Sequence, residues 1–340
     1  MCRKGKLFDR VLALGIGFFV LLFVCGMATS QEVTREHIVL GYHGWDSGRV
    51  NDNIAKFVIE KGLGYKTELI PADTIVLVTG LRRGDIDIDM EMWVENVQKA
   101  YDEGIAEGSI IDLGSDFPDS WQGFLVPTYV IKGDPERGIE PMAPDLKSVF
   151  DMPKYWKVFK DPEDPSKGRF YSCIPGWGCE KVNRAKIHAY GLDKTYNILP
   201  PGSDAALSGS MVAAYTKGKP WFGYYWAPTW PLGKLDMTPL EEPPYKKELW
   251  NEEAGYACAY PSVSVNIVVH SSLPKRAPDV VEFLKKYETS QAIHNKILAY
   301  MQDTGGKAED GAIWFFKNYE SLWTTWVSSE AAAKVKAALP

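Results

Sequence analysis

Hydrophobic and polar positions follow two different periods along the first third of the chain. Stretches rich in apolar and β-branched residues predict three strands, at 37–45, 65–72 and 86–92. Apolar residues at helical spacing between them predict three helices, at 50–61, 73–83 and 94–103. Strand–helix–strand units of this size indicate the α/β class, with a mainly parallel sheet flanked by helices.

The pattern changes in the remaining two thirds. Extended segments at 123–132 and 260–270 are predicted to be strands that enter and leave an inserted domain. Residues 278–339 are predicted to be helical. The chain after residue 30 has about 310 residues, which is more than one hydrophobic core usually serves. We therefore expect two lobes: 31–124 together with 266–340, and 125–265.

The first 30 residues have the layout of a cleavable signal peptide. Four basic residues precede an apolar run at 11–24, and the small residues ATS at 28–30 form a cleavage site. We expect export, with cleavage near Gln31. A signal anchor stays open as an alternative, since the apolar run is just under the length that spans a bilayer. Cys25 also leaves a lipid anchor open, although Phe23 and Val24 are a poor approach to a lipidated cysteine.

Charge and cysteine usage restrict the partners and cofactors. The first 30 residues hold four of the 38 Lys and Arg residues and one of the 44 Asp and Glu residues, which leaves a net charge of −9 for residues 31–340. Such a surface disfavours nucleic acid and anionic membranes. In an exported protein Cys173 and Cys179 are the natural disulfide pair, and Cys258 is expected to be a buried free thiol. A zinc site would need two further ligands, and we expect no metal or cofactor.

Twelve tryptophans are the unusual feature of the composition. Open α/β sheets bind ligands at the ends of their strands, and five tryptophans occupy loops or predicted strand ends: Trp45, Trp93, Trp121, Trp177 and Trp226. Indoles that converge on a cleft attract a methylated ammonium group by about 0.5–2 kcal/mol each. Any one of the five could instead pack in a core, as we expect for Trp314, Trp323 and Trp326, but their common placement favours a binding site.

Three motifs carry a resemblance to a known family: MEMWVEN around Trp93, CIPGWGCE around Trp177 and YYWAPTWP around Trp226. In order and spacing they resemble the periplasmic binding proteins of glycine betaine and proline betaine ABC importers, within the wider betaine/choline-binding family. The resemblance covers nearly the whole chain after the leader. It implies a two-lobed, hinged, periplasmic solute-binding protein that works with a permease and an ATPase, and we expect a monomer.

The resemblance also implies roles for particular residues. The tryptophans equivalent to Trp93, Trp177 and Trp226 box the ammonium group in that family. The cysteines of the CIPGWGCE loop are bridged there, and backbone N–H groups at the positions of Gly178 and Cys179 receive the ligand's carboxylate.

The sequence departs from the betaine pattern at the histidine that helps to hold the carboxylate. Val97 and the pair Thr229–Trp230 occupy the places where that histidine is found. Trp45 with Asp46 is similar to the choline-binding branch. Five loop tryptophans without the histidine look more like the trimethylamine N-oxide-binding proteins of the family. We therefore rank trimethylamine N-oxide ahead of glycine betaine, with choline and carnitine as alternatives.

An enzyme is the alternative from another class. Acidic residues at 86–96 and 101–108 beside a Trp-rich cleft would suit a carbohydrate-active enzyme. The acids that alternate with Ile and Met at 86–92 are, however, more typical of a solvated strand face, and Glu91, Glu95 and Glu103 lack a partner in the sequence. The chain has no nucleophile-elbow, metal-ligand or phosphate-loop motif. We expect a binding protein and no enzyme.

Overall fold

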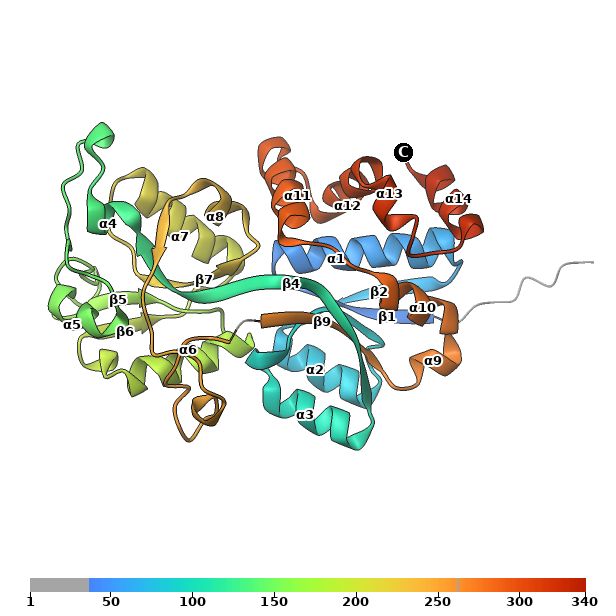
Figure 1. Cartoon of the computed structure of the whole chain (residues 1–340), viewed down its shortest axis with the longest axis horizontal. Coiled ribbons are helices and arrows are strands. Elements are labelled where there is room, and N and C mark those ends of the chain that lie inside the picture. Colours follow the sequence, from blue (N-terminus) through green and yellow to red (C-terminus); the bar gives the residue numbers. More distant parts are fainter. Residues whose placement is uncertain (1–36, 262) are drawn as a thin grey trace, which may run out of the picture. The chain divides into compact units, whose positions relative to one another are not determined.

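The computed structural model describes residues 37–261 and 263–340 of the chain (Figure 1). The predicted signal peptide lies outside these residues. Within them, no helix is both long and apolar enough to cross a membrane.

The first lobe begins with three strands in the predicted order: β1 (His37–Tyr42), β2 (Lys66–Pro71) and β3 (Ile88–Trp93). β1 pairs in parallel with both β2 and β3. Three helices connect and follow them: α1 (Asp46–Phe57), α2 (Thr74–Arg83) and α3 (Gln98–Glu107). In Figure 1, α1 covers one face of these strands and α2 and α3 cover the other. This is the predicted α/β arrangement.

Two of the predicted helices have different bounds. α1 begins at Asp46, before the predicted start, and continues into a π-helical turn, η1 (Val58–Gly62). Its first turns bury polar side chains such as Asn51 and Asp52 in a hydrogen-bonded network, so they carry no apolar periodicity to detect. The predicted helix at 94–103 is a 3₁₀ turn, η2 (Val94–Asn96), followed by α3.

Two long antiparallel strands join the two halves of the sheet. β4 (Ile110–Pro127) pairs with β9 (Val263–His270) along its first part and with β7 (Gly223–Ala227) along its second part. The strand order is β2-β1-β3-β9-β4-β7-β5-β6, and β8 (Met237–Pro239) pairs with β4 outside this path. Figure 1 shows β4 as the long strand that runs through both lobes.

The first crossing strand was predicted at 123–132, and this prediction is wrong at both ends. β4 begins at Ile110, because pairing with β9 sustains a polar segment that has no apolar alternation. It ends at Pro127, and Thr128–Lys132 forms the short helix α4. Trp121, expected before this strand, therefore lies within it.

The second lobe repeats the parallel pattern on a smaller scale. β5 (Gly168–Tyr171) pairs in parallel with β6 (Tyr196–Leu199) and with β7. Its two longest helices are α6 (Gly178–Ala189) and α7 (Asp204–Thr216). Its short helices and turns are η3 (Pro135–Arg137), η4 (Val149–Asp151), α5 (Met152–Tyr155), η5 (Leu192–Lys194), α8 (Trp230–Lys234) and η6 (Lys247–Leu249).

The C-terminal residues return to the first lobe as helices, as predicted. They are α9 (Leu273–Arg276), α10 (Pro278–Lys286), α11 (Gln291–Thr304), α12 (Ala308–Asn318), α13 (Glu320–Trp323) and α14 (Ser329–Ala338). Trp323 and Trp326 are buried in the same apolar core as α1, and Trp314 packs partly buried against it. These three tryptophans therefore have the packing role that the sequence indicated.

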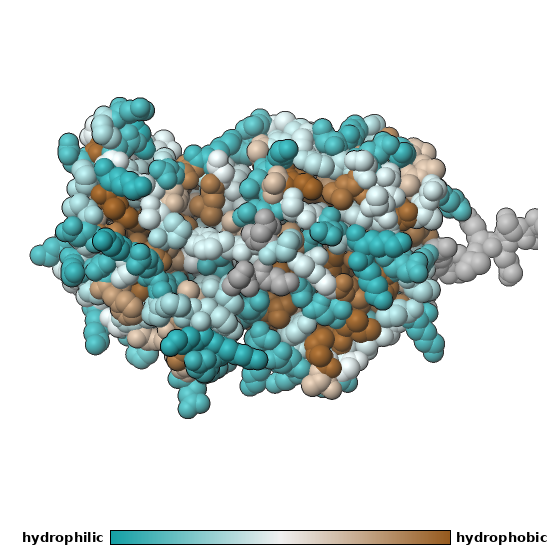
Figure 2. Space-filling view, viewed as in Figure 1, coloured by the Kyte–Doolittle hydropathy of each residue, from teal (hydrophilic) through white to brown (hydrophobic). Residues whose placement is uncertain are grey.

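The two-lobed α/β class is confirmed, with mixed rather than purely parallel sheets because β4 and β9 run antiparallel to their neighbours. One large apolar core centres on the second lobe, and another lies between the first-lobe sheet, α1 and the C-terminal helices. Figure 2 shows hydrophilic residues distributed over both lobes, with smaller apolar patches between them.

A candidate ligand site lined by four tryptophans

A small cavity between the lobes brings together most of the predicted site residues. Its volume is about 20 Å³, and it is lined by Trp45, Thr74, Trp93, Asn96, Trp177, Gly178, Cys179, Tyr224 and Trp226. Trp45 follows β1 and Trp93 ends β3, so both belong to the first lobe. Trp177 precedes α6 and Trp226 lies on β7, so both belong to the second. We call these four tryptophans the indole cage.

The rings of the cage meet at steep angles. The ring centroid of Trp177 lies 4.9 Å from that of Trp45, with 69° between the planes, and 5.4 Å from that of Trp226, with 75°. Tyr224 lies nearly parallel to Trp226, with 6.1 Å between centroids. Steeply inclined rings present faces in several directions, which suits a rounded cationic group better than a flat one.

Trp121 is the one predicted cage residue that does not line this cavity. Trp121 lies on β4, where it pairs with Ala227 of β7, and its neighbour Gln122 is buried. Gln122 Oε1 accepts hydrogen bonds from the Tyr224 hydroxyl at 2.8 Å and from Asn96 Nδ2 at 3.2 Å. Because successive side chains of a strand point to opposite faces, Gln122 faces the cavity wall and Trp121 faces away.

The CIPGWGCE segment forms the loop between β5 and α6. Cys173 and Cys179 are joined by a disulfide, and Trp177 is the extended residue before the first turn of α6. Gly178 and Cys179 are the first two residues of that helix. The first backbone N–H groups of a helix have no partner within it and carry the positive end of its dipole, so they can receive a polar or anionic group.

The two glycines beside Trp177 permit a close approach to the first lobe. Gly176 has a φ of +94°, and a Cβ there would lie 2.5 Å from Asp73 Oδ2. A Cβ on Gly178 would lie 2.4 Å from the carbonyl oxygen of Asn96. The Ile75 N–H also donates to the Gly176 carbonyl at 3.4 Å. A Gly-Trp-Gly sequence therefore lets this loop press its indole against the opposite lobe.

The acids of β3 and the segment before it are buried, so the interpretation of a solvated strand face was wrong. Asp87, Asp89 and Glu91 have exposed fractions of 3%, 2% and 0%. Each has a donor to satisfy it: Arg276 for Asp87, His43 for Asp89, and the indole N–H of Trp45 for Glu91. Buried carboxyl groups need such partners, and these come from segments distant in the sequence.

A buried polar network lies on the first-lobe side of the cage. His43 contacts Asp52 at 2.9 Å and Asp89 at 3.1 Å. Burial lowers the pKa of His43, but the two carboxylates outweigh burial and raise that pKa well above its usual value. Burial raises the pKa of Glu91 to about 7. Burial, together with the charge of Glu91, also raises the pKa of Asp116 well above its usual value.

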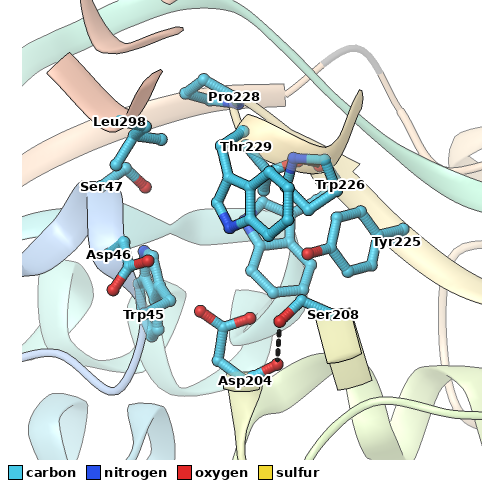
Figure 3. Close-up of a pocket in the computed structure, with 12 residues that line it drawn as sticks. Trp45, Asp46, Ser47, Asp204, Ser208, Tyr225, Trp226, Pro228, Thr229 and Leu298 are labelled. Atoms are coloured by element: carbon cyan, nitrogen blue, oxygen red, sulfur yellow. Dashed lines mark hydrogen bonds between the residues drawn. The ribbon is translucent and has the colours of Figure 1, made fainter. Parts of the chain in front are cut away.

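A second small pocket adjoins the cage through Trp45 and Trp226. Asp46 at the start of α1 and Asp204 at the start of α7 both line it (Figure 3). Burial, and then the charge of Asp46, raise the pKa of Asp204 to about 7. Burial also raises the pKa of Asp46. The surroundings of the cage are therefore acidic on this side too.

Sequence reasoning missed three residues that line the cavity: Thr74, Asn96 and Tyr224. Tyr224 precedes Trp226 by two positions on β7, and strand alternation alone would have placed both on one face. Thr74 begins the helix after β2, at a strand end of the kind that binds ligands in such sheets. Asn96 lies in the turn after Trp93, and no signal in the sequence distinguishes it.

Two α/β lobes that share long strands, with an aromatic cavity lined from both, define a two-lobed solute-binding protein. Residues 36–318 match the family described as the substrate-binding domain of ABC-type glycine betaine transport systems, and the chain belongs to this family. The resemblance inferred from the three tryptophan motifs is thus confirmed at the level of the family.

Individual relatives agree with this assignment. The chain is 24% identical over 292 residues to the trimethylamine N-oxide-binding protein of Pelagibacter ubique, which covers 86% of this chain and 90% of that one. It is 25% identical over 270 residues to the glycine betaine/proline betaine-binding periplasmic protein of Escherichia coli, covering 75% and 78%. The fold is similar to the crystal structure of the glycine betaine/L-proline-binding protein of Borrelia burgdorferi, with a TM-score of 0.71, 20% identity and coverage of 88% and 100%.

Reduction of the Cys173–Cys179 disulfide is expected to lower the free energy of unfolding by ~2 kcal/mol or less, because so short a loop removes little chain entropy. Its larger effect should be on affinity, since Trp177 loses its fixed position. Thermal unfolding and ligand titration with and without reductant measure the two effects. A variant with both cysteines changed to serine is the control, and reductant should leave it unaltered.

Cys258 is buried and free in the structure. Mass mapping of the purified protein should therefore find a free thiol at Cys258. A disulfide from Cys258 to Cys173 or Cys179 would contradict the pairing.

Proposed function

We propose that the protein is the extracytoplasmic solute-binding component of an ABC importer and captures a small methylated amine in the indole cage. The observation that carries this proposal is the convergence of Trp45, Trp93, Trp177 and Trp226 on one cavity. The fully substituted nitrogen of such a ligand has no N–H group and cannot form a hydrogen-bonded salt bridge. Ring faces within about 6 Å attract it instead, most strongly where water is excluded.

The polar lining of the cavity supports trimethylamine N-oxide ahead of glycine betaine. Among the described residues that line it there is no Lys, Arg or His. A carboxylate closed away from water needs strong donors, and an unpaired buried charge is costly. The oxygen of trimethylamine N-oxide needs only one or two donors, which the N–H groups of Gly178 and Cys179 or the side chains of Thr74 and Asn96 can supply. Asp46 and Asp204 on the adjoining pocket would also disfavour a carboxylate.

The relatives include both ligands. The match to the trimethylamine N-oxide-binding protein covers 90% of that protein at 24% identity, and the other two relatives bear glycine betaine in their names. Choline and carnitine stay as the alternative ligands, because Trp45 with Asp46 resembles the choline-binding branch.

Capture by closure of the lobes follows from the size of the cavity. A cavity of about 20 Å³ holds little more than one water molecule. Because the rings that line it come from both lobes, separation of the lobes would widen the cage and admit a methylated amine. We propose that β4 and β9 carry the hinge, between a lobe of residues 31–124 with 266–340 and an inserted lobe of 125–265.

The setting proposed for this function is the periplasm, after cleavage of the signal peptide. The protein acts there as a monomer, and its partners are the permease and ATPase subunits of the importer. The ligand is bound and released unchanged, without a cofactor.

Calorimetry of the purified mature protein against trimethylamine N-oxide, glycine betaine, choline and carnitine tests the proposal. We expect trimethylamine N-oxide to bind most tightly. Glycine betaine binding at least tenfold tighter, ~1.4 kcal/mol, would reverse the ranking and keep the transport function. Binding of a sugar such as maltose, with no methylated amine bound, would overturn the function and favour the carbohydrate class.

A further inference from the structure

Glu91 is a fully buried carboxyl group that contacts two members of the indole cage. Its Oε1 accepts a hydrogen bond from Trp45 Nε1 at 2.6 Å and lies 3.3 Å from Trp93 Nε1. The hydroxyl of Ser47 donates to the same oxygen at 2.9 Å. The other oxygen, Oε2, accepts from Asn51 Nδ2 at 2.9 Å. Both oxygens are therefore satisfied, and one of them links two indoles that arrive from different strands.

Glu91 Oε1 therefore fixes the orientation of both indole rings, those of Trp45 and Trp93. An indole has one N–H donor, and where that donor points decides which way the ring faces turn. A carboxylate acceptor makes a shorter and stronger hydrogen bond than a neutral one. It also polarises the donors that it holds, which adds electron density to the ring faces.

We propose that Glu91 is a positioning residue of the cage and favours the positively charged methylated nitrogen of the ligand, because its carboxylate orients Trp45 and Trp93 and places a buried negative charge behind them. The inference rests on the proposed function of the cage. It extends that function by assigning the ligand class to a residue outside the cavity lining.

The charges around Glu91 leave its negative charge only partly compensated. The titratable groups on the segments packed against it are His43 before α1, Asp52 on α1, Asp89 on β3, Asp116 on β4, Tyr287 after α10 and His294 on α11. His43 is held between Asp52 and Asp89 and is the cationic member of the group. Burial lowers the pKa of His294 to about 3, so that this ring is neutral. Four carboxyl groups thus share one imidazolium.

The charge of Glu91 makes ligand binding depend on pH. Burial raises its pKa to about 7, so Glu91 is largely protonated at pH 6 and largely ionised at pH 8. A permanent cation binds the ionised form better, and its affinity should rise as pH increases through 7. By linkage, binding of the cation at pH 7 should release protons. A ligand without net charge should show a weaker dependence.

Tetramethylammonium and trimethylamine N-oxide are the probes, and calorimetry at pH 6 and pH 8 is the measurement. We expect the affinity of the wild-type protein for tetramethylammonium to rise about threefold or more between these pH values. Glu91→Gln keeps the size and one acceptor oxygen but removes the charge. It should lower that affinity about tenfold at pH 8 and reduce the pH dependence to the part that Asp46 and Asp204 contribute from the adjoining pocket, with a smaller loss of affinity for trimethylamine N-oxide.

Glu68→Gln on β2 of the same lobe is the matched control, since that side chain is 56% exposed and distant from the cage lining. It should bind both probes as the wild type does, at both pH values. Circular dichroism establishes that each variant is folded.

A measurement on the wild type keeps the test independent of the variant's folding. Titration of tetramethylammonium at pH 7 in two buffers of different ionisation enthalpy gives the number of protons released. We expect net release. Zero release, or a Glu91→Gln variant that binds tetramethylammonium with wild-type affinity and pH dependence, would overturn the role of Glu91 and leave the proposed function standing. A wild-type protein that binds neither probe at either pH, and none of glycine betaine, choline and carnitine, would overturn both.

Discussion

Trp177→Ala is expected to weaken binding of the tightest methylated amine by ~1–3 kcal/mol, or about 5- to 150-fold. Trp177 is the ring in contact with both Trp45 and Trp226, so its loss opens the box on two sides. Loss of the Trp177 ring also admits water to the cage, and water weakens the attraction of the remaining rings for the cation. Calorimetry on the folded variant measures the effect. Trp93→Ala and Trp226→Ala should weaken binding in the same range.

Trp323→Ala is the matched control for an indole outside the cage. Trp323 is fully buried in the first-lobe core, and its Nε1 donates to the Phe316 carbonyl at 2.9 Å. Its removal should lower the free energy of unfolding by ~3–5 kcal/mol, measured by denaturant titration. The affinity of the folded fraction should stay within about twofold of the wild type, as expected for a distant, independent site. Normal binding by Trp177→Ala would contradict the role given to the CIPGWGCE loop.

Gly178→Ala should lower ligand affinity by about tenfold or more, because an added methyl group blocks closure of the lobes. The Cβ would lie 2.4 Å from the Asn96 carbonyl oxygen and 2.9 Å from its carbonyl carbon. These are backbone atoms and have no rotamer to adopt in response. Relief therefore requires the loop before α6 to move away from the turn after β3, which also moves Trp177 away from the cage.

Gly209→Ala on α7 is the control for this substitution. A Cβ there meets no atom within 4 Å, and alanine favours a helix over glycine. This variant should bind ligand as the wild type does and unfold at an equal or higher temperature. If Gly178→Ala retains wild-type affinity, the close approach of this loop to Asn96 is not part of the ligand-bound state.

The elements with a strong local signal could be predicted from the sequence. β1, β2 and β3 lie in stretches rich in apolar and β-branched residues. α2 has both an apolar face and the terminating Gly84 in a left-handed conformation. The first half of β4 has no such local signal, because its polar residues are held in the strand by backbone pairing with β9. Sequence periodicity reports burial against an apolar core, and a strand sustained by backbone hydrogen bonds alone does not produce it.

The same limit explains the candidate site. Trp45, Trp93, Trp177 and Trp226 could be grouped because each lies at a strand or helix end, where ligands bind in open α/β sheets. Trp121 was grouped with them but does not line the cavity, since it alternates with Gln122 on β4 and so lies on the opposite face of the strand. Glu91 was missed because its donors, Trp45, Ser47 and Asn51, lie about forty residues away in the sequence.

A crystal structure of the protein with its tightest methylated amine tests the cage most directly. We predict that the ligand nitrogen lies within about 6 Å of the ring centroids of Trp45, Trp93, Trp177 and Trp226. The polar end of the ligand should meet the first turn of α6. A ligand bound elsewhere, or a nitrogen held by carboxylates with the four indoles out of reach, would contradict the account.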